Sequence, residues 1–145
     1  MLDFPQSQMI AVNGVELEVF TAGSGKPIVL CHGWPEHAFS WRHQIQPLVD
    51  AGYHVIVPNQ RGYGHSTKPD DVTDYAIEHL SGDLIALLDH FGYDDACFVG
   101  HDWGAIIVWN ARKAANYTIA PGVTLVAMLL GSECKSSLTG QTLPD

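Results

Sequence analysis

Short, largely apolar runs alternate along the chain with longer stretches in which apolar residues recur every three or four positions. The run from Pro27 to Cys31 is continuous, which is typical of a strand buried on both faces of a sheet. His54 to Pro58 predicts another buried strand, Ala96 to His101 the next, and Val123 to Leu130 one more. These runs predict a sheet with buried central strands.

Helical spacing lies between these runs. The clearest helix is predicted over Ile77 to Phe91, and Gly92 is suited to end it because glycine readily adopts the left-handed conformation found there. Its apolar face consists of Ile77, Leu80, Leu84, Leu87, Leu88 and Phe91. A helix is also predicted around Trp41 to Leu48, ending near Gly52, and another from Trp103 to about Ala115.

The chain opens on a hairpin and then alternates strands with helices. Gln8 to Val12 and Val15 to Phe20 are separated by Asn13-Gly14, a pair that favours a type I′ turn. The alternation that follows predicts βαβ units with right-handed crossovers. The fold class is therefore α/β, with a mostly parallel sheet covered by helices on both faces.

The pentapeptide Gly100-His101-Asp102-Trp103-Gly104 lies where a predicted strand meets a predicted helix. Its pattern is that of the nucleophile elbow, G-x-S-x-G, with aspartate in place of serine. So tight a turn favours glycine near the nucleophile, and the helix N-terminus favours a negative charge at Asp102. Taken alone, the pentapeptide also fits a simpler interpretation, in which Asp102 only caps the helix.

Two more glycine-bearing segments follow predicted strands. Cys31-His32-Gly33-Trp34-Pro35-Glu36 follows the first buried strand, and the segment from Asn59 to Ser66 follows the second. In parallel sheets the chemistry gathers at the carboxyl ends of the strands. Together, H-G-W-P-E, R-G-Y-G-x-S and G-H-D-W-G-A resemble the epoxide hydrolases of the α/β-hydrolase superfamily, in the same order and spacing, from about Met9 to Asn110.

The resemblance implies that Asp102 is the nucleophile, that the backbone N–H groups of Trp34 and Trp103 form the oxyanion hole, and that Trp34-Pro35 is a cis peptide. It implies a small apolar epoxide as substrate, with no cofactor and no metal ion. The chemistry agrees, because a carboxylate nucleophile suits attack on an sp³ carbon and gives an alkyl-enzyme ester, whereas serine suits acyl transfer. When water attacks that ester, negative charge develops on an oxygen of Asp102 itself.

Other residues of these motifs have simpler interpretations. Trp34 and Trp103 could be core aromatics. His32 and His101 are expected to be structural hydrogen-bond partners rather than catalytic bases. The segment Arg61 to Gly64 is expected to be a structural turn. The remaining histidines are interpreted as scattered surface or helix residues without metal-ligand spacing: His37, His43, His54, His65, His79 and His90.

The resemblance fades after Asn110 and is lost by about Arg112. Relatives continue with a cap, further strands, a catalytic acid and a catalytic histidine, whereas no histidine follows His101 here. We therefore expect a partial α/β-hydrolase domain over residues 1–131, with about six strands and without the cap and last strands, and a polar, disordered tail over 132–145. The open sheet edge near Val123 to Leu130 favours homo-oligomers or aggregation.

Composition and charge exclude several classes of binding partner. The formal net charge is −9, from 7 lysines and arginines against 16 aspartates and glutamates, which argues against nucleic acid and anionic membranes. Met1 to Gln8 has no features of a secretory signal, and no apolar stretch approaches the roughly 20 residues that span a bilayer. The three cysteines, Cys31, Cys97 and Cys134, fit neither a disulfide framework nor a zinc motif. We expect buried free thiols and a cytoplasmic protein.

Three functions stay open at this point. The first is an epoxide hydrolase that works through an alkyl-enzyme ester. The second is a haloalkane or haloacid dehalogenase, which also places aspartate at the elbow; the fluoroacetate type carries arginines in the region that Trp103, Ile106 and Ile107 occupy here, which disfavours it. The third is a catalytically inactive remnant, which the missing histidine favours for this particular polypeptide.

Overall fold

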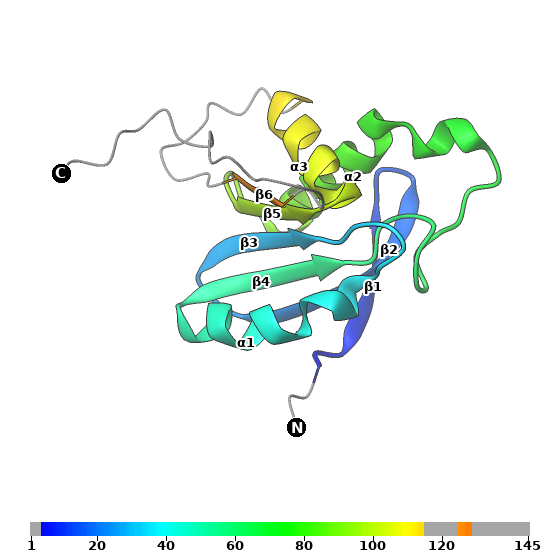
Figure 1. Ribbon diagram of the computed structural model, residues 1–145. Coiled ribbons are helices and arrows are strands. Elements are labelled where there is room, and N and C mark those ends of the chain that lie inside the picture. The colour runs from blue at the N-terminus through cyan, green and yellow to red at the C-terminus, as the bar shows by residue number, and fades with distance from the viewer. Residues whose placement is uncertain (1–3, 115–124, 129–145) are drawn as a thin grey trace.

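The computed structural model describes residues 4–114 and 125–128, which form a single six-stranded sheet in the order β1-β2-β4-β3-β5-β6 (Figure 1). The strands are β1 Ser7–Val12, β2 Val15–Gly23, β3 Lys26–Cys31, β4 Tyr53–Pro58, β5 Cys97–His101 and β6 Leu125–Met128. The α-helices are α1 Arg42–Asp50, α2 Ile77–Phe91 and α3 Trp103–Ala114, and the short 3₁₀ helices are Ala38–Trp41 and Val72–Tyr75. The predicted α/β class is confirmed.

Strand directions divide the sheet into two parts. The β1–β2 and β2–β4 pairs are antiparallel, whereas β4–β3, β3–β5 and β5–β6 are parallel. The hairpin turn has positive φ at both central residues, 47° at Asn13 and 77° at Gly14, as a type I′ turn requires. The antiparallel hairpin and the parallel core are therefore both as predicted.

Helices cover both faces of the sheet, α1 on one face and α2 with α3 on the other (Figure 1). In strand β3, successive side chains therefore alternate between the two faces of the sheet. Ile28 and Leu30 belong to the apolar cluster under α1, whereas Val29 and Cys31 belong to the cluster under α2 and α3. Complete burial of such aliphatic side chains contributes about 1.5–3 kcal/mol each, so both faces contribute to holding the central strands in place.

Element ends differ slightly from the prediction. Helix α2 has the predicted bounds, and Gly92 caps it with φ 73°. Helix α1 begins at Arg42 because Trp41 ends the preceding 3₁₀ helix. Strand β5 begins at Cys97, one residue later than predicted, and β6 occupies the middle of the predicted Val123 to Leu130 strand. The predicted tail over 132–145 lies outside the described residues.

No helix in the described part of the chain is long and apolar enough to cross a membrane.

A buried ion pair fixes the segment between β4 and α2. Arg61 donates from Nε and Nη2 to the two carboxylate oxygens of Asp83, at 2.7 and 2.6 Å, and both side chains are at most 4% exposed. The Nη1 atom of Arg61 donates to the Asp74 carbonyl at 2.7 Å, and Asn13 of the hairpin donates to Asp83 at 2.9 Å. Arg61 thus ties the segment after β4 to α2, through an acidic partner that the motif does not contain.

Candidate active site

Asp102 occupies the single residue between β5 and α3. Its φ of 54° lies in the left-handed region, which a residue other than glycine rarely adopts, so the backbone at the elbow is strained. The flanking glycines are required by packing. A Cβ on Gly104 would overlap the carbonyl oxygen of Cys31, and one on Gly100 would overlap the first turn of α3. The elbow therefore lies directly against the end of β3.

The loop after β3 brings a main-chain donor to the carboxylate. The backbone N–H of Trp34 donates to Asp102 Oδ1 at 3.0 Å. The Trp34-Pro35 peptide is cis, as the resemblance implied, and the turn is closed by the Glu36 N–H, which donates to the Gly33 carbonyl at 3.0 Å. Trp34 and Asp102 are therefore in contact through the main chain of Trp34.

The surroundings of Asp102 favour its charged form. Hydrogen bonds from the backbone N–H groups of Trp103 and Trp34 lower the pKa of this carboxyl group, and a smaller contribution from His101 acts in the same direction against the effect of burial. The half-buried Asp102 is therefore ionised at neutral pH, with two backbone N–H groups directed at it. A nucleophilic carboxylate needs this charge state.

The side chains of both tryptophans point away from the core. Trp34 is 66% exposed and Trp103 is 55% exposed, so the alternative interpretation of core aromatics is wrong. Ile106 and Trp109 on α3 are exposed as well, whereas Ile107 is buried. An apolar surface on the loop after β3 and along α3 therefore flanks the charged carboxylate of Asp102.

Both histidines of the motifs make hydrogen bonds. His101 Nδ1 lies 3.1 Å from Glu36 Oε2, which joins the residue before Asp102 to the loop after β3. His32 is fully buried, and its Nε2 accepts from the Gln60 N–H at 3.1 Å while its Nδ1 lies 2.9 Å from the Gly33 carbonyl. Burial lowers the pKa of His32 to about 4. Its predicted structural role agrees with these contacts.

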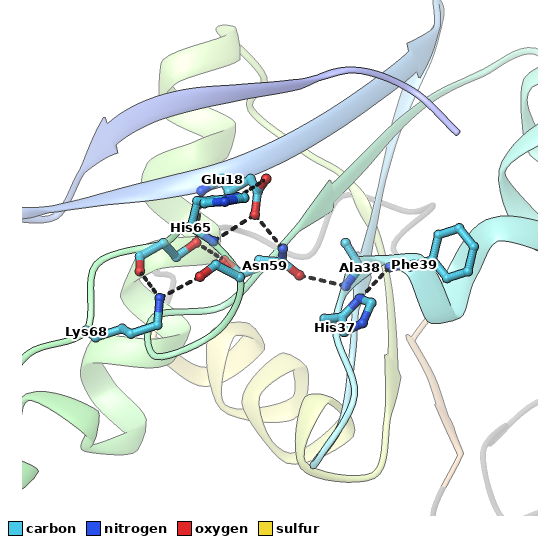
Figure 2. Close-up of polar contacts among 9 residues, drawn as sticks. Glu18, His37, Ala38, Phe39, Asn59, His65 and Lys68 are labelled. Atoms are coloured by element: carbon cyan, nitrogen blue, oxygen red, sulfur yellow. Dashed lines mark hydrogen bonds and ion pairs between the residues drawn. The ribbon is translucent and has the colours of Figure 1, made fainter. Parts of the chain in front are cut away.

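A second polar cluster is centred on Glu18, Asn59 and His65 (Figure 2), and the sequence motifs do not indicate the part that Glu18 plays in it. Glu18 of β2 accepts from Asn59 Nδ2 at 2.8 Å and from the backbone N–H and ring Nδ1 of His65, both at 2.9 Å. Asn59 in turn accepts from the Ala38 N–H at 2.7 Å. The cluster thus ties β2, the segment after β4 and the segment before α1 together.

Glu18 is buried, and burial works to raise its pKa. Hydrogen bonds from the backbone and ring of His65, from Asn59 and from Ser7 outweigh burial and lower the pKa to about 2. The interpretation of the remaining histidines as surface or helix residues is wrong for His54, which is half-buried on strand β4. His65 is exposed but bonded to Glu18, and half-buried His54 bonds to the Tyr93 hydroxyl at 2.8 Å. No group of three or more histidine, cysteine or acidic residues within the described segments could hold a metal ion.

Comparison with known proteins agrees with this geometry. The chain matches the model of the alpha/beta hydrolase fold over residues 26–127. It is 54% identical over 109 residues to epoxide hydrolase A of Mycobacterium tuberculosis, a match that covers 74% of this chain and 34% of that protein. An epoxide hydrolase of Caballeronia sordidicola is 46% identical over 102 residues, which cover 70% of this chain and 31% of that protein.

Solved structures give the same result. A crystal structure of epoxide hydrolase A from Mycobacterium thermoresistibile superposes with a TM-score of 0.73 at 52% identity, covering 74% of this chain and 34% of that one. An epoxide hydrolase from Vigna radiata gives a TM-score of 0.81 at 35% identity, covering 88% and 39%. The chain therefore belongs to the α/β-hydrolase fold family. Within that family it is similar to epoxide hydrolases, and it spans about a third of the length of the curated relatives named above.

Proposed function

We propose that this chain carries the nucleophile and the oxyanion donors of an epoxide hydrolase, with a small apolar epoxide as substrate and no cofactor. The observation that carries the proposal is the ionised Asp102 at a strand-to-helix elbow, with the Trp34 N–H 3.0 Å from Oδ1. The similarity to epoxide hydrolases supports the choice of substrate class. The exposed apolar side chains of Trp34 and Trp103 support an apolar substrate.

The first step is alkylation of Asp102. We assign the attack to Oδ2, because Oδ1 is held by the Trp34 N–H. The new bond forms between Oδ2 and a ring carbon while the C–O bond of the epoxide at that carbon breaks. The epoxide oxygen stays on the neighbouring carbon and takes up a proton from water. The product is an ester between Asp102 and the substrate.

The second step is hydrolysis of this ester by water. Water attacks the carboxyl carbon of Asp102. The resulting oxyanion on Oδ1 accepts hydrogen bonds from the backbone N–H groups of Trp34 and Trp103. Removing one such donor typically reduces the rate by about 10²–10³. The tetrahedral intermediate then collapses, and the bond between the carboxyl carbon and Oδ2 breaks. Oδ2 leaves as one hydroxyl oxygen of the diol, taking up a proton, while the oxygen of the attacking water stays on Asp102 and restores its carboxylate.

No residue of this chain is assigned to the proton donor of the first step or to the base that activates water in the second. The 145 residues contain no histidine after His101, and a general base contributes about 10²–10⁴ in rate. The proposal for this polypeptide is therefore that its chemistry stops after one equivalent, at the ester. A dehalogenase would form the same kind of alkyl ester from a haloalkane. The two functions are therefore distinguished by the rates at which an epoxide and a haloalkane label Asp102.

Mass spectrometry of the intact chain tests the proposal. After incubation with styrene oxide we expect one equivalent of adduct on Asp102, no adduct in Asp102→Ala, and wild-type labelling in Asp70→Ala, a control on an exposed loop. Faster labelling by a bromoalkane of similar size would favour the dehalogenase. An inert Asp102 with both reagents would favour the inactive remnant, and repeated turnover would show that another residue acts as base.

A further inference from the structure

The peptide group between Gly33 and Trp34 is held at both of its polar atoms. Its N–H, which belongs to Trp34, donates to Asp102 Oδ1 at 3.0 Å. Its carbonyl oxygen, which belongs to Gly33, lies 2.9 Å from His32 Nδ1 and accepts from the Glu36 N–H at 3.0 Å. One peptide therefore connects a buried histidine to the carboxylate oxygen on which the proposed oxyanion develops.

The contacts of His32 define which of its ring nitrogens carries the proton. A backbone N–H can only donate, so the Gln60 N–H at 3.1 Å requires an unprotonated, accepting Nε2. A carbonyl oxygen can only accept, so Nδ1 must carry the hydrogen that it donates to Gly33. The ring is thus the neutral Nδ1–H tautomer. In a doubly protonated ring, the hydrogen on Nε2 would point at the hydrogen of the Gln60 N–H and repel it.

The environment of His32 stabilises this neutral form. The ring is fully buried and makes a T-shaped contact with the Tyr63 ring, with centroids 4.7 Å apart. Burial is the largest cause of the lowered pKa of His32; His37 adds to it, while the Gly33 carbonyl and Glu36 oppose it. The Gln60 side-chain amide also donates to the His32 carbonyl, which holds the residue in place from its main-chain side.

We infer that His32 is a positioning residue for the oxyanion donor: as the neutral Nδ1–H tautomer it orients and polarises the Gly33–Trp34 peptide, whose N–H is directed at Asp102. The inference rests on the proposed function for its relevance to the reaction. A peptide whose carbonyl accepts a hydrogen bond becomes a stronger donor at its N–H, because successive hydrogen bonds polarise one another. His32 acts on Asp102 only through this peptide and touches no reacting atom.

The first test needs no substitution. In the unaltered chain, ¹⁵N NMR of the histidine rings reports which nitrogen of each ring is protonated. We expect His32 to show a protonated Nδ1 and an unprotonated Nε2 across neutral pH. A proton on Nε2, or rapid exchange between the two tautomers, would overturn the inference regardless of how any variant folds.

The second test compares two amides that each reproduce one of the two ring contacts. In His32→Asn the side-chain amide lies near the position of Nδ1 and can donate to the Gly33 carbonyl. In His32→Gln the longer side chain reaches the position of Nε2 and can accept from Gln60. We expect the pKa of Asp102, followed by ¹³C NMR of its carboxyl carbon, to rise toward the ordinary aspartate value in His32→Gln and to stay low in His32→Asn.

A purely structural role would make the two variants change the pKa of Asp102 alike, in proportion to their loss of stability, and would contradict the inference. His43→Gln, the same change at an exposed position of α1, is the matched control and should leave Asp102 unchanged. The titration uses no substrate, so it can succeed when adduct formation fails. Failure of adduct formation therefore overturns the proposed function, whereas failure of the titration overturns only the role of His32.

Discussion

Gly33 lies directly against Asp102, with no space for a side chain between them. A Cβ on Gly33 would lie 2.6 Å from Asp102 Cβ and 2.8 Å from the His101 carbonyl oxygen. The elbow and the loop after β3 can therefore approach closely enough for the Trp34 N–H to reach the carboxylate only because residue 33 is glycine.

Gly33→Ala is expected to separate the two segments. The overlap should cost about 1–3 kcal/mol in the free energy of unfolding and should lengthen the hydrogen bond from the Trp34 N–H to Asp102. Urea denaturation measures the stability and mass spectrometry the yield of styrene oxide adduct, which should fall. Gly14→Ala is the control, since its Cβ would meet nothing within 4 Å; it should cost about 1 kcal/mol through its positive φ and leave the adduct yield unchanged.

Asp83→Ala should be strongly destabilising. It leaves the guanidinium of Arg61 buried without its partner, which typically costs about 3–5 kcal/mol. The double variant Arg61→Met with Asp83→Leu removes both charges and should be more stable than Asp83→Ala alone. Urea denaturation of Asp83→Ala, the double variant and the exposed control Asp70→Ala ranks their free energies of unfolding. Equal values for Asp83→Ala and Asp70→Ala would contradict the prediction.

Glu18 should contribute to acid unfolding. Its pKa is lowered from 4.5 to about 2, so its stabilising effect is fully present above about pH 4.5 and is lost as the pH falls through about 2. Glu18→Gln should flatten the pH dependence of unfolding in that window. It should also cost about 1–3 kcal/mol at pH 7, because the amide leaves a buried donor without an acceptor. Exposed Glu16→Gln on the same strand should reproduce neither effect.

Labelling of Asp102 should be insensitive to mild acid. Because hydrogen bonds from Trp103 and Trp34 lower the pKa of Asp102, the carboxylate stays ionised at every pH above the ordinary aspartate value of 3.8. The rate constant for alkylation by styrene oxide, measured by mass spectrometry, should therefore stay constant between about pH 8 and pH 5. A rate that falls by half near pH 6 would show that burial, rather than the backbone N–H groups, dominates at this carboxyl group.

The edge of the sheet should promote self-association. Strand β6 ends the strand order in the part of the chain that the structure describes, and an unpaired strand edge can pair with another chain. We expect sedimentation velocity to show oligomers whose proportion rises with concentration. A monodisperse monomer with a sharp, cooperative thermal transition would contradict this expectation.

Local patterns were sufficient to predict most of the fold and the position of the elbow. Asn13-Gly14 determines the hairpin, and Gly92 ends α2, because both depend on the conformations of one or two residues. Glu18 could not be predicted in this way. The alternation along β2 places Glu18 on the polar face, yet the segment after β4 folds over that face and buries it.

Hydrogen-bond partners that lie far apart in the sequence could not be predicted either, because local patterns do not show which segments pack together. The R-G-Y-G motif identifies Arg61 but not Asp83, which lies 22 residues further along on α2. A lone acidic residue in an amphipathic helix is ordinary, and only the packing of α2 against the segment after β4 gives it a buried partner. Gln60, which bonds to His32, likewise comes from a separate segment, so the motif could indicate a structural role for His32 but not the full set of its contacts.

The parallel pairing of β3 and β5 places Cys31 opposite Gly100, and the donor loop and the nucleophile follow directly from these two strand ends. Both proposed oxyanion donors are main-chain groups, so their positions depend on strand register rather than on the side chains at positions 34 and 103. Under the proposed function, a substitution at either exposed side chain would change the fit to the substrate without moving the backbone donors. In evolutionary terms, selectivity and chemistry are separable at the same two residues.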